Sequence, residues 1–210
     1  MSLPTPYYED KERGIVIYNA DCRDILEHLP KVDLLLTDPP YGVKKDYATY
    51  DDSQSVDWIV ETLMGIDAPK LITPGVNNIW KYPPADWVIG WFKPNSMSRS
   101  CIANANVWEP ILVYGCKNFG VDGISVSIVP QRDTGDHPCP KPVALFKWLL
   151  HRQKHETVLD PFMGSGTTLV ACKQLGRKCI GIDISLDYCR IAVQRLSQDL
   201  LFDSEELAQL

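Results

Sequence analysis

Short apolar runs alternate along this chain with segments in which apolar residues recur every three or four positions. The first run, residues 14–20, is rich in β-branched side chains and predicts a strand. In residues 21–29, the apolar positions from Cys22 to Leu29 follow the spacing i, i+3, i+4, i+7 and predict an amphipathic helix that Pro30 ends. Strands that alternate with helices predict an α/β fold rather than a β-sandwich.

A compact apolar run at residues 32–37 shows little polar alternation, as expected of a central parallel strand covered on both faces. It ends abruptly at residues 38–42, which read Asp-Pro-Pro-Tyr-Gly. The following stretch, residues 43–57, is polar and acidic, lacks periodicity and exceeds the length of an ordinary connection. We therefore expect a loop there, followed by a helix over residues 56–65.

The rest of the chain continues the alternation. Expected strands cover residues 70–73, 87–92, 107–114, 157–159 and 178–184. Expected helices cover residues 142–151 and 167–175, and a last helix follows Ser185, with a poorly ordered acidic tail after Ser197. Because no repeat or low-complexity tract divides the chain, we predict a single domain over residues 1–210. Its expected architecture is a doubly wound, mostly parallel sheet with helices on both faces.

Composition and charge narrow the choice of function. The chain has 210 residues, 45% of them hydrophobic and 23% charged, which is typical of one globular domain able to bury a sizeable core. Its net charge of −6 argues against a protein that holds nucleic acid by diffuse neutralisation of phosphates. Nucleic acid remains a partner only through a local basic cleft, for which the candidate side chains are Lys44, Lys45, Lys81, Lys93, Arg99 and Arg132.

The seven cysteines are odd in number and form no CxxC pair, which indicates reduced thiols inside a cell. The first residues lack the basic and apolar stretches of a signal peptide, and no apolar run approaches the ~18 residues of a membrane span. We therefore expect a cytoplasmic protein without membrane contact. We predict no metal site, because His151 and His155 stand without an HExxH motif or a neighbouring Cys/His cluster.

Residues 158–168, which read VLDPFMGSGTT, have the order of a strand, a glycine turn and a helix start. In this arrangement backbone N–H groups approach a ligand at the carboxyl end of a sheet, and Gly164 and Gly166 provide the room. No Lys follows the second glycine as in a P-loop, and the full GxGxxG spacing is absent, so a different adenosine-bearing ligand is indicated. Asp183 ends the next expected strand, where an acidic side chain can bind ribose hydroxyls or, alternatively, cap the following helix.

The sequence after the strand at residues 32–37 offers hydrogen-bond acceptors and an aromatic ring. Pro39 and Pro40 have no N–H, so their carbonyls and the Asp38 carboxylate make the surroundings rich in acceptors. Such a pocket suits a substrate that donates from an –NH₂ group while its ring stacks on Tyr41, as a flipped nucleobase would. The alternative is a plain turn after a buried strand.

Together the two motifs resemble the S-adenosylmethionine-dependent DNA methyltransferases that modify exocyclic amino groups. DPPY at 38–41 is similar to their catalytic motif and DPFMGSGTT at 160–168 to their cofactor motif, in the order of the circularly permuted beta arrangement. The segments at 19–22, 108–113 and 137–142 extend the resemblance over most of the chain. The resemblance implies a Rossmann-like methyltransferase fold, S-adenosylmethionine as cofactor and no metal.

The resemblance also implies roles for single residues. Asp38 and the Pro39 carbonyl would accept hydrogen bonds from the target amino group, and Tyr41 would stack on the base. The catalytic residues implied in this way are Asp38, Pro39, Pro40 and Tyr41. The cofactor-binding residues implied are Asp21, Cys22, His137, Lys141, Asp160, Phe162, Gly164, Ser165, Gly166, Thr167, Thr168 and Asp183. Because the substrate supplies the nucleophile, Cys139 receives no covalent role.

Asp in the first motif position is commoner in adenine enzymes and Ser in N4-cytosine enzymes, so the resemblance implies N6-adenine methylation of double-stranded DNA, with base flipping, within restriction-modification. N4-cytosine methylation, RNA methylation and a non-catalytic cofactor- or nucleic-acid-binding relative stay open as alternatives. Since the framework takes up most of the chain, residues 43–57 and 117–136 are the candidate recognition segments. A homodimer in which both subunits contact the DNA is a further open alternative.

Overall fold

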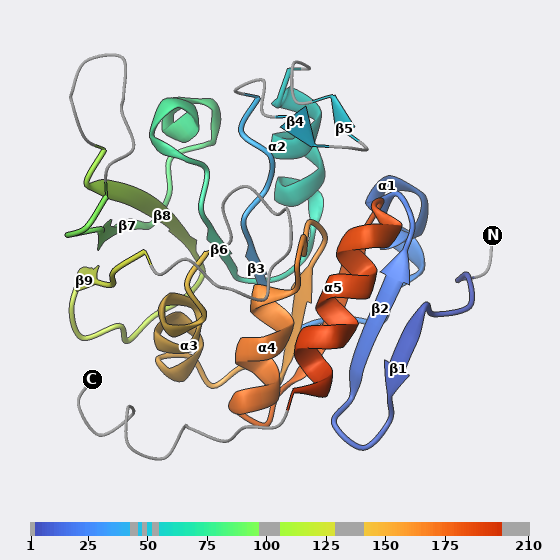
Figure 1. Cartoon of the computed structure of the whole chain (residues 1–210). Coiled ribbons are helices and arrows are strands. Elements are labelled where there is room, and N and C mark those ends of the chain that lie inside the picture. The colour runs from blue at the N-terminus through green and yellow to red at the C-terminus, as the bar shows by residue number, and fades with distance from the viewer. Residues whose placement is uncertain are drawn as a thin grey trace.

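The computed structural model describes residues 3–42, 46–47, 50–51, 55–96, 106–128 and 141–198. Within these ranges a nine-stranded sheet runs through the centre of the molecule and helices cover both of its sides (Figure 1). A separate two-stranded hairpin consists of β4 (Asp46–Tyr47) and β5 (Tyr50–Asp51). The predicted α/β class is confirmed.

The large sheet is mostly parallel, as predicted. Its strands are β1 (Tyr8–Asp10), β2 (Ile15–Asn19), β3 (Leu34–Thr37), β6 (Lys70–Ile72), β7 (Trp87–Phe92), β8 (Trp108–Tyr114), β9 (Gly123–Ser125), β10 (Thr157–Asp160) and β11 (Lys178–Asp183). They are ordered β1-β2-β11-β10-β3-β6-β8-β7-β9. The five neighbours from β2 to β6 are parallel, whereas β1 and β8 run against the strands beside them.

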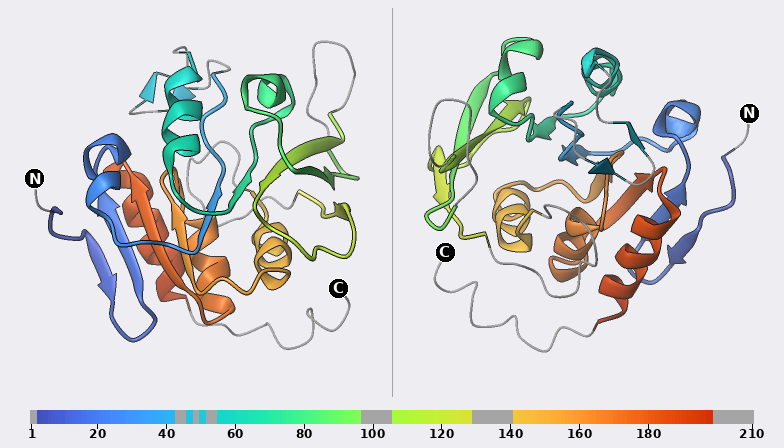
Figure 2. Two further views of the ribbon diagram at one scale, coloured as in Figure 1. Left: turned by 180° about the vertical axis from the view of Figure 1, so that it is seen from behind. Right: turned by 45° about the horizontal axis from the view of Figure 1, so that its top comes forward.

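Helices cover both faces of the sheet (Figure 2). They are α1 (Cys22–Ile25), α2 (Asp57–Gly65), α3 (Val143–His151), α4 (Thr167–Gln174) and α5 (Leu186–Ser197), with 3-10 turns η1 (Leu26–His28) and η2 (Val76–Lys81). Buried side chains of α3, α4 and α5 form one apolar cluster with the sheet. Side chains of α1 and α2 form a second cluster with the sheet. This division matches the doubly wound arrangement that the sequence predicts.

Five elements lie where the sequence pattern predicts none, namely β1, β4, β5, β9 and the 3-10 turn η2. The four strands have only two or three residues each, too few to show a hydrophobic period, and η2 spans only six residues. The predicted helix over 21–29 divides into α1 and the 3-10 turn η1, and the side chain of Asp21 caps α1 by accepting a hydrogen bond from the backbone N–H of Arg23. Among the described residues, no helix is long and apolar enough to cross a membrane.

The two candidate recognition segments differ from simple loops. Residues 43–57 include the hairpin of β4 and β5, and α2 begins at Asp57. In residues 117–136, β9 pairs with β7 and so belongs to the large sheet, while residues 129–136 lie outside the described part of the chain. A role of either segment in sequence recognition stays a prediction. The tail from residue 199 onward also lies outside the described residues.

The topology brings the two sequence motifs to one edge. β3 leads into Asp38, and β10, which leads into the glycine turn, is its direct neighbour and runs parallel to it. Parallel strands end at the same edge of a sheet, the upper edge in Figure 1 toward which β2 points. Thr37 and Asp160, 123 positions apart in sequence, are joined there by a side-chain hydrogen bond of 2.7 Å.

At Gly166 the start of α4 approaches α5 closely. Its φ of 81° is left-handed, and an added Cβ would lie 2.7 Å from the Cβ of Ala192. Ala192 has no rotatable side chain that could move aside. Gly176 has a similar φ of 65°, but an added Cβ there would meet nothing within 4 Å. The two positions therefore differ mainly in the close approach.

We predict that Gly166→Ala destabilises the protein more than Gly176→Ala does. Both changes carry the left-handed backbone cost of about 1–2 kcal/mol, and Gly166→Ala adds an overpacking cost of about 1–3 kcal/mol. Urea denaturation of both variants measures the free energies of unfolding. Equal losses for the two variants would contradict the close contact between α4 and α5.

Candidate active site

The carboxylate of Asp38 lies directly after β3 and is held by three side chains. Its Oδ1 accepts hydrogen bonds from the hydroxyls of Tyr41 at 2.6 Å and Thr73 at 2.5 Å. The Lys141 Nζ lies 2.8 Å from Oδ1 and 2.9 Å from Oδ2. Among the described residues, Oδ1 thus has three donors and Oδ2 only one. Since a carboxylate oxygen can accept two hydrogen bonds, Oδ2 keeps acceptor capacity for a ligand.

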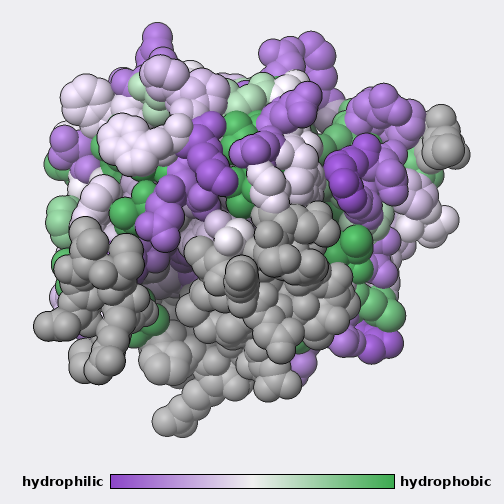
Figure 3. Space-filling view, turned by 90° about the horizontal axis from the view of Figure 1, so that it is seen from above, coloured by the Kyte–Doolittle hydropathy of each residue, from purple (hydrophilic) through white to green (hydrophobic). Residues whose placement is uncertain are grey.

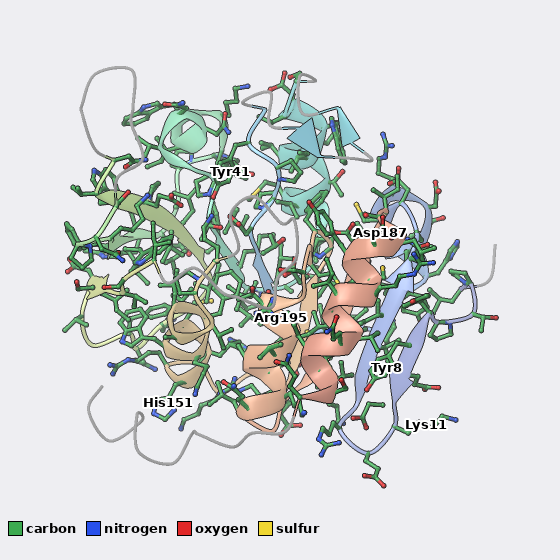
Figure 4. The ribbon with its side chains drawn as sticks, viewed as in Figure 1. Tyr8, Lys11, Tyr41, His151, Asp187 and Arg195 are labelled. Atoms are coloured by element: carbon green, nitrogen blue, oxygen red, sulfur yellow. The ribbon has the colours of Figure 1, made fainter. Side chains whose placement is uncertain are left out.

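Tyr41 is oriented by its backbone and by its ring. Its carbonyl accepts a hydrogen bond of 2.8 Å from the Nδ2 of Asn78, and its ring lies so close to Gly75 that an added Cβ there would be 3.0 Å from two ring atoms. Burial, together with the Asp38 charge, raises the pKa of Tyr41 well above its usual value, so the hydroxyl keeps its proton and donates to Asp38. Figure 4 shows Tyr41 at the upper edge of the sheet. Its stacking on a base stays a prediction.

A buried chain of charges continues from Asp38. Lys141 also lies 2.7 Å from the Tyr41 hydroxyl and 3.4 Å from Oε2 of Glu109, whose other oxygen is 2.7 Å from Nζ of Lys93. Although burial lowers it, the neighbouring Asp38, Tyr41 and Glu109 hold the pKa of Lys141 well above its usual value. Although burial raises it, the two lysines hold the pKa of Glu109 below its usual value. Lys141 and Glu109 therefore both keep their charge in this network.

Lys93 corrects one expectation from the sequence. The sequence makes it a candidate for a basic surface cleft, but its side chain is only 2% exposed and pairs with Glu109. A single sequence shows that a lysine is present but not which strand partner buries it. The sequence does not single out Thr73 and Glu109 as candidate site residues. Thr73 nevertheless follows an expected strand, and Glu109 lies in the segment 108–113 that extends the resemblance.

Asp160 is buried beside the glycine turn and holds it in place. It is 2% exposed, and its Oδ1 accepts hydrogen bonds from the Thr37 hydroxyl at 2.7 Å and from the Phe162 backbone N–H at 3.1 Å. The Thr168 hydroxyl at the start of α4 donates to its Oδ2. Burial raises the pKa of Asp160 to about 7. One carboxylate thus ties together the ends of β3 and β10 and the start of α4.

The same turn is also held from α5 and β11. Arg195, which α5 contributes (Figure 4), donates from Nη1 to the carbonyl of Ser165 at 2.7 Å and lies 3.3 Å from the Thr167 hydroxyl. The backbone N–H of Gly164 donates to Oδ2 of Asp183 at 2.9 Å. Arg195 has no motif signal in the sequence, because its partners belong to a turn 30 residues earlier.

Asp183 accepts hydrogen bonds from two backbone N–H groups, one ahead of α5 and one in the glycine turn. Its Oδ1 accepts the backbone N–H of Ser185 at 2.8 Å, ahead of α5, while its Oδ2 holds Gly164. Ser185 itself caps α5 through its side chain. Burial raises the pKa of Asp183 to about 6. Binding of ribose hydroxyls by Asp183 stays a prediction.

A pocket joins the two motifs. It encloses about 310 Å³ of space, part of it open to solvent, and places Asp38 and Lys141 opposite the glycine turn. The residues that line it are Asp38, Lys141, Phe146, Asp160, Phe162, Met163, Gly164, Ser165, Thr167 and Thr168. Figure 3 looks down on this edge of the molecule and shows mainly hydrophilic and near-neutral residues around the grey atoms.

Of the predicted cofactor-binding residues, four do not line this pocket: Asp21, Cys22, Gly166 and Asp183. Cys22 lies in the core, where burial raises the pKa of its thiol to about 12. Asp21 forms an ion pair with Arg23, whose guanidinium lies 4.7 Å above the ring of Trp58, and this ring meets Phe162 edge-on at 5.9 Å. His137 lies outside the described residues. The roles of these residues in cofactor binding stay predictions.

The chemistry of the pocket suits a ligand that carries both signs of charge. Carboxylates of Asp38 and Asp160 lie on its wall, while the first N–H groups of α4 have no partner within the helix and favour an anion. Phe146, Phe162 and Met163 add apolar surface for a ring or an aliphatic chain. Within the described residues, no group of three or more His, Cys, Asp or Glu side chains could hold a metal ion.

Comparison with known proteins gives consistent matches. The family model N6_N4_Mtase, described as DNA methylase, matches residues 104–194. The type II methyltransferase M2.LlaDCHI of Lactococcus lactis subsp. cremoris is 44% identical over an alignment that covers 93% of this chain and 93% of that protein.

Solved structures show the same likeness. The M1.HpyAVI–SAM complex is 27% identical with a TM-score of 0.67, over 88% of this chain and 100% of that chain. PvuII DNA methyltransferase, titled cytosine-N4-specific, has a TM-score of 0.69 at 16% identity, over 97% of this chain and 93% of that chain. At 16% identity the likeness shows the fold alone.

We predict that Asp160→Asn changes the pH dependence of stability. An ordinary Asp ionises near pH 4 in the unfolded chain, while Asp160 in the fold has a pKa of about 7. Between these values the folded state holds a proton that the unfolded state lacks, so the contribution of Asp160 falls as pH rises. The variant removes this dependence. Its melting temperature relative to the natural chain therefore rises from pH 5 to pH 8, and parallel melting profiles would contradict the assignment.

Proposed function

The chain belongs to the family of DNA methyltransferases that modify the exocyclic amino group of adenine (N6) or cytosine (N4), and from this premise we propose that it methylates N6 of adenine. S-adenosylmethionine is the cofactor of this family, and the fold is the Rossmann-like methyltransferase fold. The observation that carries the proposal is the pocket that the Asp38 carboxylate shares with the glycine turn. An acceptor for an amino group would thus lie beside a site for the methyl donor.

The glycine turn and its neighbours would hold the cofactor. Phe162 and Met163 would offer apolar surface to the adenosine part, and the backbone of Thr167 and Thr168 at the start of α4 would offer N–H groups to the carboxylate of the methionine part. When bound, S-adenosylmethionine supplies a methyl group on a positively charged sulfur. Arg195 and Asp160 act indirectly, because they hold the turn in place.

Asp38 would prepare the amino group of the substrate. The lone pair of an exocyclic amino nitrogen is delocalised into the base ring, which makes the nitrogen a poor nucleophile. Acceptors at Oδ2 of Asp38 and at the Pro39 carbonyl would favour a pyramidal nitrogen and make its lone pair available. Tyr41, Thr73 and Lys141 fix the orientation of the carboxylate in advance. No cysteine nucleophile is required.

The choice of adenine rests on Asp38. Asp at the first position of the catalytic motif is commoner in adenine enzymes of the family, and Ser is commoner in N4-cytosine enzymes. N4-cytosine methylation is the second candidate, since the family covers both the N6 amino group of adenine and the N4 amino group of cytosine. RNA methylation and a non-catalytic role are outcomes of the tests below.

We further propose that the target base leaves the stack. An amino group inside a duplex cannot reach a carboxylate that lies in a pocket, so the base must flip. The net charge of −6 argues that binding relies on a confined contact area, and a second subunit would extend it. Flipping, a homodimer and a cytoplasmic location are all parts of the proposal.

We predict that Asp38→Asn lowers methyl transfer by at least about a hundredfold, the typical effect of removing one preorganised electrostatic contact. The variant keeps the shape of the side chain, so S-adenosylmethionine binding, measured by calorimetry, should persist. Asp187→Asn, at an exposed position on α5, is the control and should keep full activity. Full activity of Asp38→Asn would overturn the catalytic assignment.

The modified base is identified directly from DNA of cells that produce this chain alone. We predict that mass spectrometry of the digested DNA detects N6-methyladenine, and that sequencing of the modified sites gives the target context. N4-methylcytosine would replace the adenine assignment by the second candidate. Modification of RNA alone, or a methyl group on carbon 5 of cytosine, would overturn the proposal.

A further inference from the structure

Glu109 and Lys93 form a buried ion pair that the proposed reaction does not use directly. Neither residue lines the pocket, yet their side chains are only 14% and 2% exposed. Buried ion pairs add little stability, because removing two charges from water costs about as much as their attraction returns. Their presence behind the catalytic motif therefore needs another explanation.

The ion pair has its negative member, Glu109, nearer to the pocket than its positive member, Lys93. The Glu109 carboxylate lies 3.4 Å from Nζ of Lys141 and 3.5 Å from the Tyr41 hydroxyl, so its negative end faces the pocket wall. Lys93 lies on the other oxygen of Glu109, at 2.7 Å, and forms the positive end behind it. Lys141, by contrast, lines the pocket itself. The Lys141 ammonium is therefore shared between two carboxylates, one in the pocket and one behind it.

We propose that Glu109 sets the electrical potential of the cofactor pocket, so that the pocket accepts a cationic sulfonium in spite of the Lys141 ammonium in its wall. This inference rests on the proposed function. Methyl transfer requires the donor and the amino nitrogen at Asp38 to lie in contact, which places the sulfonium in the part of the pocket that Lys141 lines. If Glu109 were absent, Asp38 alone would balance the two lysines of this network. The network would then carry a net positive charge.

The size of the effect follows from Coulomb's law. One unit charge acting across about 8–10 Å at an effective dielectric constant near 20 changes a binding constant by roughly 15- to 35-fold. S-adenosylhomocysteine, the product, carries a neutral sulfur but is otherwise the same ligand. The ratio of the two affinities therefore reports the charge at the sulfur and cancels losses that come from a distorted pocket. Glu109 acts through Lys141 and is a positioning residue, not a catalytic one.

The test compares the affinities of both ligands in four variants by calorimetry. Glu109→Gln keeps the shape of the side chain and should weaken S-adenosylmethionine relative to S-adenosylhomocysteine by roughly 15- to 35-fold. Lys93→Met removes the positive end and should shift the ratio the opposite way, and the double variant should lie between the two. Lys70→Met is the matched control, since Lys70 is a buried lysine that, among the described residues, donates to the carbonyls of Ile66 and Ala68. Its ratio should not change.

Equal weakening of both ligands in Glu109→Gln would overturn the inference and leave Glu109 a packing role. If Glu109→Gln fails to fold, Lys93→Met decides, and an unchanged ratio there overturns the inference as well. Failure of the natural chain to bind S-adenosylmethionine or to methylate DNA would instead overturn the proposed function. The two failures are therefore distinguishable.

Discussion

The contact between Lys141 and Asp38 is the interaction on which the site depends. It joins the end of β3 to the residue two positions before α3, 103 positions away in sequence, and draws Tyr41 and Glu109 into the same network. A buried charge without its partner costs several kcal/mol, about 3–5 kcal/mol when one member of a buried pair is removed. The two segments must therefore meet in the folded protein, and the Asp38 carboxylate keeps one orientation.

A second carboxylate, Asp160, holds the backbone segments of the site together, as Lys141 holds the side chain of Asp38. Through Thr37 and Thr168 it fixes the distance between the catalytic strand, the glycine turn and α4. Because β3 and β10 are direct parallel neighbours, both motifs end at one edge of the sheet. The order of the motifs along the chain is thus of no consequence for the site, since the sheet places their strands side by side.

The sequence predicted the elements with a strong hydrophobic pattern and the two motifs that face the pocket. The central strand at 32–37 is a continuous apolar run and the helix after Ser185 has a clear period, whereas β1 and β9 are too short to show either pattern. The second layer of the site was not predictable in this way, because Glu109, Lys93 and Arg195 act through contacts between elements distant in sequence. Lys93 is an example: it is a candidate for a surface cleft by sequence but is buried against Glu109 in the structure, because a single sequence does not reveal which charges are buried in pairs.

The central claim is that one pocket holds the methyl donor next to Oδ2 of Asp38, which can still accept a hydrogen bond from an amino group. A crystal structure of this chain with bound S-adenosylmethionine tests it most directly. The account predicts that the cofactor lies along the glycine turn with its methyl group toward Asp38, whose Oδ2 remains open to an amino group beside the Lys141 ammonium. A cofactor bound elsewhere, or a sulfonium turned away from Asp38, would contradict the account.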